Sequence, residues 1–335
     1  MTQTIENAVA EAIYVSNSLG EALQAFEIGN EPDLYAGVGY AHYESLWDSV
    51  AAAIIAAIPG AFMSGPAIAS TGNIASWIQP FALAEKGRRL TVLTQHRYVA
   101  ASGTDATLLN DVGNATKFMQ ELKSLANANG MAWRLSETGS YYNATYSPSS
   151  GSVAMDFASA LWALDYLFAS VANGGQGVNL HNGNLVQYSS EVPFSDDEVN
   201  SVTFVNAVYY GMLLFSLGGT GDLVPTSLSE VADVTTYTVM VDANHYSTWI
   251  LNKDQTSSRN LIATVKLPSA VKTATIKLLQ AAALDAHDGI AIQGSSVGVD
   301  GAFDPAPDYI ATIDKNTVTC YAPYNCAILV QTVLS

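Results

Sequence analysis

Two glutamates, Glu31 and Glu137, each follow a short apolar segment that is typical of a buried strand. Asn30 directly precedes Glu31, and Glu137 lies in the sequence Leu-Ser-Glu-Thr-Gly. In a barrel of parallel strands, the reacting groups lie at the carboxyl ends of the strands. We therefore expect the two carboxyl groups to meet above one barrel, although they are far apart in the chain. Two carboxyl groups, one protonated and one ionised, are the groups that hydrolyse glycosidic bonds.

Each glutamate also has a structural interpretation. An acidic residue at the end of a strand is frequently a turn residue or the N-cap of the next helix. Taken singly, neither Glu31 nor Glu137 is specific for catalysis. The pair is far more specific, because both glutamates end strands of one strand–helix series and Asn30 stands directly before Glu31.

The elements that must position these glutamates follow from the hydrophobic periodicity. Helices are predicted for residues 5–18, 40–58, 73–84, 104–129, 152–172 and 202–217. Strands are predicted between them, for residues 23–28, 61–64, 90–95, 131–136 and 177–180. Strands that alternate with helices indicate a parallel sheet covered by helices.

From about residue 220 the pattern changes to closely spaced strands. These runs are residues 235–241, 247–251, 261–267, 274–279, 309–313 and 327–333. Short strands without intervening helices indicate an all-β sandwich. The sequence therefore predicts a catalytic (β/α) barrel domain in residues 1–218 and a β-sandwich domain in residues 219–335.

The composition excludes several classes of protein. With 49% hydrophobic and 13% charged residues among 335, the chain is not intrinsically disordered. Thirteen Lys and Arg stand against 30 Asp and Glu, a net charge of −17 that disfavours a nucleic-acid partner. The most apolar stretch, residues 50–63, contains Pro59-Gly60 and is too short to span a membrane. The first residues lack the basic and apolar regions of a signal peptide.

Five stretches of this sequence resemble glycoside hydrolase family 79, the β-glucuronidases and heparanases. They are residues 29–33, 94–98, 135–139, 157–168 and 177–183, of which the last two are the most particular to the family. The resemblance implies a (β/α)8-type barrel followed by a β-sandwich. It also implies a retaining enzyme that cleaves β-linked glucuronic acid with two glutamates and without a metal or organic cofactor. The partner implied is a glucuronide or a glycan that contains glucuronic acid.

The same resemblance implies a role for each residue of the site. Glu31 would be the general acid/base and Glu137 the nucleophile. The implied substrate-binding residues are Asn30 at the sugar 2-hydroxyl, Tyr98 and Tyr142 at the rim, and Gly183 and Tyr188 near the uronate carboxylate. The family is mostly secreted or lysosomal, so the resemblance implies a secreted protein.

The chain departs from the family pattern in two ways. Arg97 stands where the family more often has tyrosine, and we expect it to be solvated outside the barrel, the alternative being a cation for an acidic substrate. In the family, Glu31 follows the fourth barrel strand, but only one helix and one strand precede it here. We therefore expect strands four to eight alone in this chain, with a separate N-terminal segment as one way to complete the barrel.

Two further hypotheses about function remain from the sequence. The chain could be a catalytically impaired fragment that binds carbohydrate, because the early strands are missing. It could also be a retaining β-glycosidase with a different sugar specificity.

Histidine and cysteine residues add little to this interpretation. The five histidines lack the spacing of metal ligands, so we expect each of them, His96 included, to be a satisfied or exposed side chain. Cys320 and Cys326 are close enough for a disulfide across a hairpin, and two free thiols are the alternative.

Overall fold

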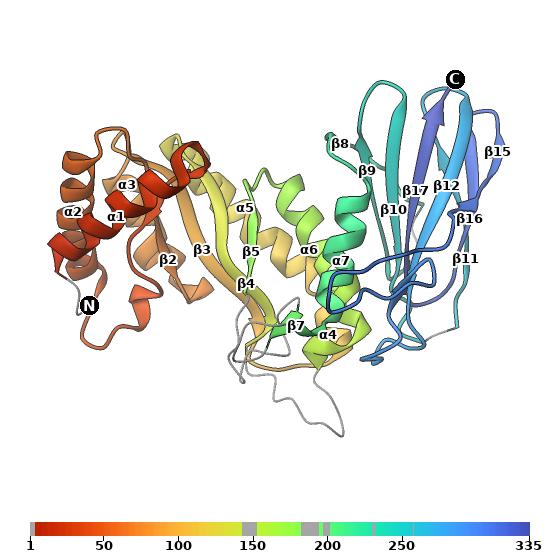
Figure 1. The fold of residues 1–335 in the computed structure, drawn as a ribbon, viewed down its shortest axis with the longest axis horizontal. Helices are drawn as coiled ribbons and strands as arrows, with labels where there is room; N and C mark the ends of the chain where they lie inside the picture. The colour runs from red at the N-terminus through yellow and green to blue at the C-terminus, as the bar shows by residue number, and fades with distance from the viewer. Residues whose placement is uncertain (1–3, 143–152, 182–193, 197–201, 230–231, 257) are drawn as a thin grey trace. The chain divides into compact units, whose positions relative to one another are not determined.

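The structure is a computed structural model that describes residues 4–142, 153–181, 194–196, 202–229, 232–256 and 258–335 (Figure 1). Contacts divide the chain into two compact units. The first comprises Met1–Arg97, Asn114–Thr138 and Asn173–Asn179, and the second comprises Tyr98–Gly113, Gly139–Ala172 and Leu180–Ser335. Each unit is described by itself below. The domain boundary expected between residues 218 and 219 stays a prediction.

The first unit is built around a five-stranded sheet. Its order follows the chain, from β1 (Phe26–Glu27) through β2 (Met63–Ile68), β3 (Leu90–Ala100) and β4 (Ala132–Tyr141) to β5 (Val178–Leu180). The β1–β2 and β2–β3 pairs are parallel. All six residues of β2 are buried, as expected for a parallel strand that is covered on both faces.

The helices of the first unit bury one face each. They are α1 (Ile5–Leu19), α2 (Tyr40–Ala57), α3 (Gln79–Ala84) and α5 (Val112–Asn129). In α2 the buried residues Tyr43, Trp47, Ala51 and Ile54 recur every three or four positions, which forms one stripe along the helix. Trp47 packs edge-on against Phe81 of α3, with ring centroids 5.1 Å apart. The expected series of strands and helices is confirmed.

The second unit combines helices with antiparallel sheets. Its helices include α4 (Asp105–Leu109), α6 (Phe157–Ala172) and α7 (Ala207–Leu217). The larger sheet has the order β13-β12-β17-β10-β9-β8 with β14 beside β12, and the smaller sheet has the order β11-β16-β15. The bounds are β8 Asp222–Val224, β9 Val234–Met240, β10 His245–Asn252, β11 Leu261–Lys266, β12 Val271–Gln280, β13 Ala291–Ile292, β14 Tyr309–Ile310, β15 Thr312–Asp314, β16 Thr317–Ala322 and β17 Cys326–Leu334.

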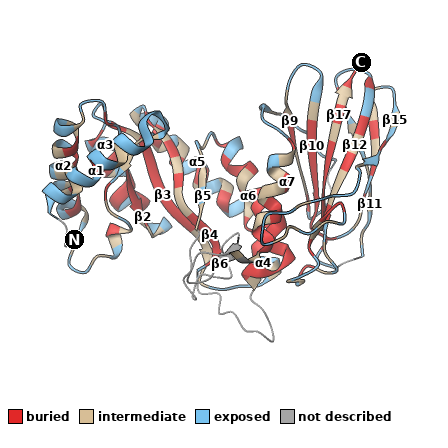
Figure 2. Cartoon of the chain, viewed as in Figure 1, coloured by how far each residue is buried: buried red, intermediate tan, exposed pale blue. Residues whose placement is uncertain are grey.

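Residues of β10 alternate between the two hydrophobic cores of this unit. Trp249 and Leu251 face α6 and α7, where they pack with Phe168 and Leu214. Ile250 faces the smaller sheet and its core. Successive side chains of a strand point to opposite faces of its sheet, so the larger sheet contributes residues to both cores. Figure 2 shows α6 buried along most of its length, which explains its apolar sequence.

Three details differ from the expectation. In the helix expected over residues 73–84, Ile74–Ile78 form the π-helical turn η4, and α3 begins only at Gln79. Residues 202–205 were expected in a helix but form β7 (Val202–Val205), which pairs with β6 (Phe194–Asp196). The Val-Thr-Phe-Val sequence favours a strand, and the helix begins only after the extended N-cap Asn206. The expected helix over residues 104–129 is divided into α4 and α5.

The two cysteines do not form a disulfide. Cys320 and Cys326 are free and buried, and burial raises the pKa of their thiols to about 11 and about 12.

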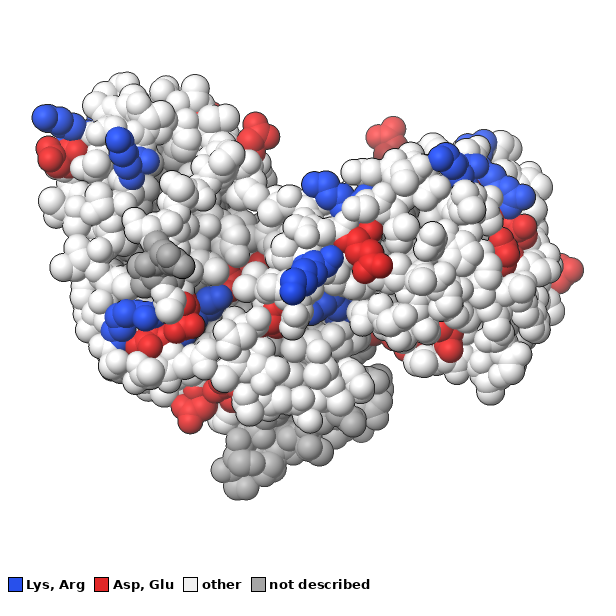
Figure 3. Space-filling model, turned by 180° about the vertical axis from the view of Figure 1, so that it is seen from behind, with Lys and Arg blue, Asp and Glu red and all other residues white. Residues whose placement is uncertain are grey.

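No helix in the described part of the chain is long and apolar enough to cross a membrane. Charged side chains cover little of the face shown in Figure 3, in keeping with their 13% share of the sequence.

Candidate active site

Glu31 is held at the end of β1 by an unusual backbone conformation. Its φ of 53° and ψ of 51° are left-handed, which costs a residue other than glycine about 1–2 kcal/mol. The Glu31 N–H donates to the Ala67 carbonyl at 2.9 Å, and Pro32 begins the 3₁₀ turn η2 (Pro32–Leu34) directly after it. The backbone of the glutamate is therefore fixed by its own loop and by the loop after β2.

Asp33 joins these two loops. Its carboxylate accepts hydrogen bonds from the Ala69 N–H at 2.8 Å, the Ser70 N–H at 3.0 Å and the Asn73 side-chain amide at 3.1 Å. Hydrogen bonds to a charged acceptor are stronger than neutral ones. Asp33 thus positions the Glu31 loop, a role that the sequence analysis did not assign although the residue belongs to the same motif.

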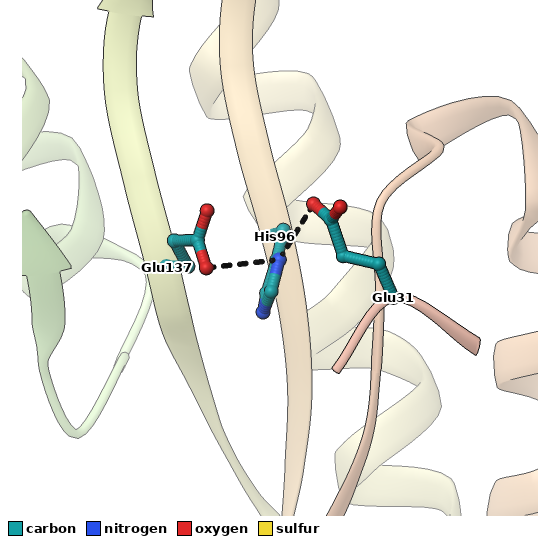
Figure 4. Close-up of side chains that lie close together, drawn as sticks. All are labelled: Glu31, His96 and Glu137. Atoms are coloured by element: carbon teal, nitrogen blue, oxygen red, sulfur yellow. Dashed lines mark hydrogen bonds and ion pairs between the residues drawn. The ribbon is translucent and has the colours of Figure 1, made fainter. Parts of the chain in front are cut away.

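Glu137 and His96 come from neighbouring strands, β4 and β3, and both glutamates point toward the imidazole (Figure 4). His96 Nδ1 lies 3.0 Å from Glu31 Oε1 and 3.6 Å from Glu137 Oε2. One oxygen of each carboxylate and Nδ1 all lie within 4.8 Å of one another. The structure therefore brings together the two predicted carboxyl groups.

The three side chains differ in how far they are buried. The His96 side chain is 2% exposed, whereas those of Glu31 and Glu137 are 27% and 25% exposed. Of the two carboxylates, only that of Glu31 is within hydrogen-bonding distance of Nδ1, so the tautomer with its proton on Nδ1 would orient the Glu31 carboxylate. His96 was expected to be a satisfied histidine, and the sequence offered no sign that its partners are the two glutamates.

The same three side chains could also hold a metal ion. Two carboxylates and an imidazole suit divalent transition metals, and this is the only such cluster among the described residues. Structural zinc sites have four protein ligands, whereas three are present here, which matches a site with an open position. A metal is therefore a second interpretation of this geometry, and it requires its own test.

The structure describes three of the five predicted substrate-binding residues. Asn30 is exposed beside Glu31, and its N–H donates to the Tyr35 hydroxyl at 3.1 Å. Tyr98 and Tyr142 pack edge-on with ring centroids 5.8 Å apart, within the second unit. Their contacts with a substrate stay predictions. Gly183 and Tyr188 lie outside the described residues.

Arg97 corrects one expectation. It is 5% exposed instead of solvated, and its guanidinium lies 6.0 Å from the centre of the Phe118 ring in α5. Successive residues of a strand point to opposite faces. Because His96 faces the glutamates, Arg97 faces the helix layer, which also disfavours the alternative in which it binds an acidic substrate.

Glycosidases are among the known proteins that resemble this chain in sequence or in fold. No family model matches the sequence. A β-glucuronidase of Aspergillus niger is 26% identical over 245 residues, which cover 64% of this chain and 44% of the relative. This chain thus spans less than half the length of that curated relative.

Two solved structures share the fold over nearly the whole chain. One is a 4-O-α-L-rhamnosyl-β-D-glucuronidase of Fusarium oxysporum, with a TM-score of 0.78 and 18% identity. The match covers 98% of this chain and 74% of the Fusarium chain. An α-L-arabinofuranosidase of Thermotoga maritima has a TM-score of 0.74 and 11% identity, with 99% of this chain covering 74% of it. The chain therefore has a partial α/β barrel with a β domain, an architecture shared with glycoside hydrolases. Family 79 in particular, and the absence of its first strands, stay predictions.

Proposed function

We propose that this chain carries the catalytic pair of a retaining glycosidase that cleaves β-linked glucuronides. The observation that carries the proposal is the meeting of Glu31 and Glu137 on either side of one buried imidazole. Retaining enzymes place their carboxyl groups about 5–5.5 Å apart, and inverting enzymes about 6.5–9.5 Å apart. Carboxylate oxygens within 4.8 Å of each other support the retaining class.

The reaction follows from the two roles. Glu31 donates its proton to the glycosidic oxygen while Glu137 attacks the anomeric carbon, so that the C–O bond breaks and a glycosyl ester forms. Glu31, now ionised, takes a proton from water, and the resulting hydroxide displaces Glu137 from the sugar. The first step takes a proton from Glu31 and the second returns one from water, so the enzyme ends in its starting state and no cofactor is consumed. His96 holds Glu31 in place through both steps.

The choice of sugar rests on similarity to known proteins. The relative from Aspergillus niger is a β-glucuronidase, and the Fusarium structure is a glucuronidase in complex with Rha-GlcA. The fold alone does not select the sugar, because the arabinofuranosidase has a TM-score of 0.74 against 0.78. A retaining β-glycosidase with another specificity is therefore the second candidate. Secretion and a separate segment that completes the sheet remain predictions.

Turnover of 4-nitrophenyl β-D-glucuronide tests the proposal. We expect hydrolysis with retention of configuration, read by NMR of the first product anomer, and its loss in Glu31→Gln and Glu137→Gln. Glu121→Gln is the matched control, since Glu121 is an exposed glutamate of α5. Inversion, or unchanged rates in either site variant, contradicts the mechanism. Faster turnover of the glucoside or galactoside selects the second candidate, and binding without turnover indicates an impaired carbohydrate-binding fragment.

Chelation separates the metal interpretation from the carboxylate mechanism. The proposed mechanism predicts unchanged turnover after dialysis against EDTA and no stoichiometric metal by elemental analysis of the purified chain. Loss of turnover that is restored by a divalent metal would instead assign Glu31, His96 and Glu137 as ligands.

A further inference from the structure

The strand β2 ends in a bulge beside the site. Between Pro66 and Ile68 the pairing with β3 advances by two residues on β2 and by one on β3, so Ala67 is the extra residue. Ala67 is fully buried and has a φ of 53°, in the left-handed region. A bulge bends its strand and turns a backbone group out of the regular ladder. Here the Ala67 carbonyl accepts the Glu31 N–H at 2.9 Å, so the bulge holds the backbone of that glutamate.

The side chain of Gln95 ties this bulge to β3. Its Nε2 donates to the carbonyl of Ile68 at 2.8 Å and to the carbonyl of His96 at 2.9 Å. Ile68 directly follows Ala67, and His96 is the histidine that lies between the two glutamates. One side chain thus joins the segment that holds Glu31 to the residue that contacts its carboxylate.

Gln95 is fully buried, and its amide group is only partly satisfied. Its exposed fraction is 0%, and its Oε1 has no hydrogen-bond partner among the described residues. A buried acceptor without a partner lowers stability, whereas an apolar side chain of similar size would avoid that cost. Leu93, two residues earlier on the same face of β3, is such a buried apolar side chain. The position that Gln95 holds therefore explains the glutamine better than the stability that it provides.

The two glutamates are held beside His96 in different ways (Figure 4). Glu137 lies in β4, which is paired with β3, so the regular ladder fixes its separation from His96. Glu31 lies in a loop that is bonded to the segment after the bulge, residues 67–73. Its place relative to His96 therefore depends on how that segment is held against β3, and the Gln95 side chain provides that link.

We propose that Gln95 is a positioning residue of the site, which sets the separation of the Glu31 carboxyl group from His96 and hence from Glu137. The role rests on the glycosidase reaction proposed above. In a retaining enzyme the two carboxyl groups must stay about 5–5.5 Å apart, because a wider gap admits a water molecule between nucleophile and sugar. Gln95 touches no reacting atom, so it acts only through the backbone of residues 67–68 and of His96.

Amide hydrogen exchange in the full chain tests this role without turnover. Gln95→Met removes both N–H donors and keeps an unbranched side chain of similar length. We expect the Glu31 amide to exchange about tenfold faster, since the segment that accepts its hydrogen bond is held less firmly. Gln293→Met is the matched control. Gln293 is a glutamine of the second unit that is 3% exposed, and its amide also bonds to backbone groups, those of Leu278 and Pro307. An unchanged Glu31 amide, or an equal change in the control, would overturn the proposal.

Turnover separates positioning from a general loss of stability. Gln95→Met should lower kcat for 4-nitrophenyl β-D-glucuronide about tenfold with little change in KM, because a shift of about 1 Å at a reacting group costs about 10²-fold in rate and a smaller shift costs less. The loss should be smaller for 2,4-dinitrophenyl glucuronide, which depends little on the acid Glu31. An equal loss for both substrates would limit Gln95 to a structural role and overturn the proposal.

Gln95→Glu is the second variant, in case Gln95→Met does not fold. When protonated, its buried carboxyl group offers one O–H donor in place of two N–H groups, and when ionised it offers none. The Glu31 amide should therefore exchange faster than in the wild type, and the ratio of the two rates should rise with pH. Equal rates at every pH would contradict the role of Gln95. A wild-type chain without turnover would count against the glycosidase reaction alone, because exchange is measured independently of it.

Discussion

Two clusters in this molecule combine a pair of carboxyl groups with a histidine, and they differ in which group is buried. In the first unit, His96 is almost fully buried and the carboxylates of Glu31 and Glu137 are about a quarter exposed. In the second unit, the side chain of Asp156 is 6% exposed and that of His287, whose Nδ1 lies 2.8 Å from it, is 36% exposed. The first arrangement presents carboxyl groups to a substrate, whereas the second hides them.

Burial changes the charge of the second cluster. Desolvation, followed by the negative charge of Asp105, raises the pKa of Asp156 to about 8. Desolvation is also the largest cause of the raised pKa of Asp105. Asp156 therefore keeps its proton near neutral pH and donates it to Asp105, although a position next to a helix N-terminus ordinarily favours ionised carboxylates. The pair therefore holds a proton at neutral pH.

The largest predicted effect separates the two clusters by reactivity. Glu31→Ala should lower kcat for 4-nitrophenyl glucuronide by about 10²–10⁴-fold, the range for loss of a general acid. The loss should be much smaller for 2,4-dinitrophenyl glucuronide, whose leaving group needs no proton. Asp156→Asn, which alters the buried pair, should leave both rates near wild type. Equal losses for the two substrates would contradict the assignment of Glu31 as the acid.

The next effect concerns the histidines. His96→Ala removes the donor that holds Glu31, and a displacement of about 1 Å at a reacting group costs about 10²-fold in rate. We expect kcat to fall with little change in KM. His96→Asn should recover part of the rate, because its amide can donate from nearly the position of Nδ1. His287→Ala is the control in the other cluster, and an equal loss there would mean that the imidazoles act through stability alone.

How far the sequence predicts these clusters depends on how local their signals are. Glu31 and Glu137 could be found because each follows a strand, and parallel strands end at the same edge of a sheet. The role of His96 could not be found, since a single histidine in an apolar strand gives the same pattern whether or not its neighbours in space are acidic. Asp105, Asp156 and His287 come from three distant segments, so only the folded chain shows that they meet.

The same distinction holds for the fold. Periodicity predicts the strand–helix series and most strands of the sandwich, because burial repeats every two or three to four residues. It does not predict that residues 202–205 pair with β6 or that β16 joins the smaller sheet, since pairing depends on distant partners. Arg97 shows the limit for one side chain: its sequence suggests exposure, but Phe118 and the α5 layer cover it.

A smaller effect is expected where the loop, and not the imidazole, positions Glu31. Asp33→Ala removes the acceptor of three hydrogen bonds and should lower stability by about 2 kcal/mol or more, with about a tenfold loss in kcat. Asp48→Ala is the control: Asp48 pairs with Arg88 at a largely exposed site, where an ion pair is worth about 0–1 kcal/mol. Urea denaturation and turnover measure both quantities, and unchanged kcat in a destabilised Asp33→Ala would limit the loop to a structural role.

The smallest effect tests the stored proton. The pKa of Asp156 is raised on folding from about 3.9 in the unfolded chain to about 8. Its contribution to stability is therefore full below about pH 4 and declines as the pH rises toward 8. Asparagine cannot ionise but can still donate to Asp105, so Asp156→Asn should remove this decline.

The measurement is the Tm of Asp156→Asn and wild type between pH 5 and pH 8.5. The variant should gain about 1 kcal/mol or more at the alkaline end, a difference of roughly 2–4 °C for a protein of this size. The difference should be smallest at pH 5 and should grow steadily toward pH 8. Asp285 and His287 also face Asp156, so Asp285→Asn serves as the control for remote charge. A difference that is constant across this range would show that Asp156 is ionised in the folded protein, and the contrast between an exposed reactive pair and a buried protonated pair would fail.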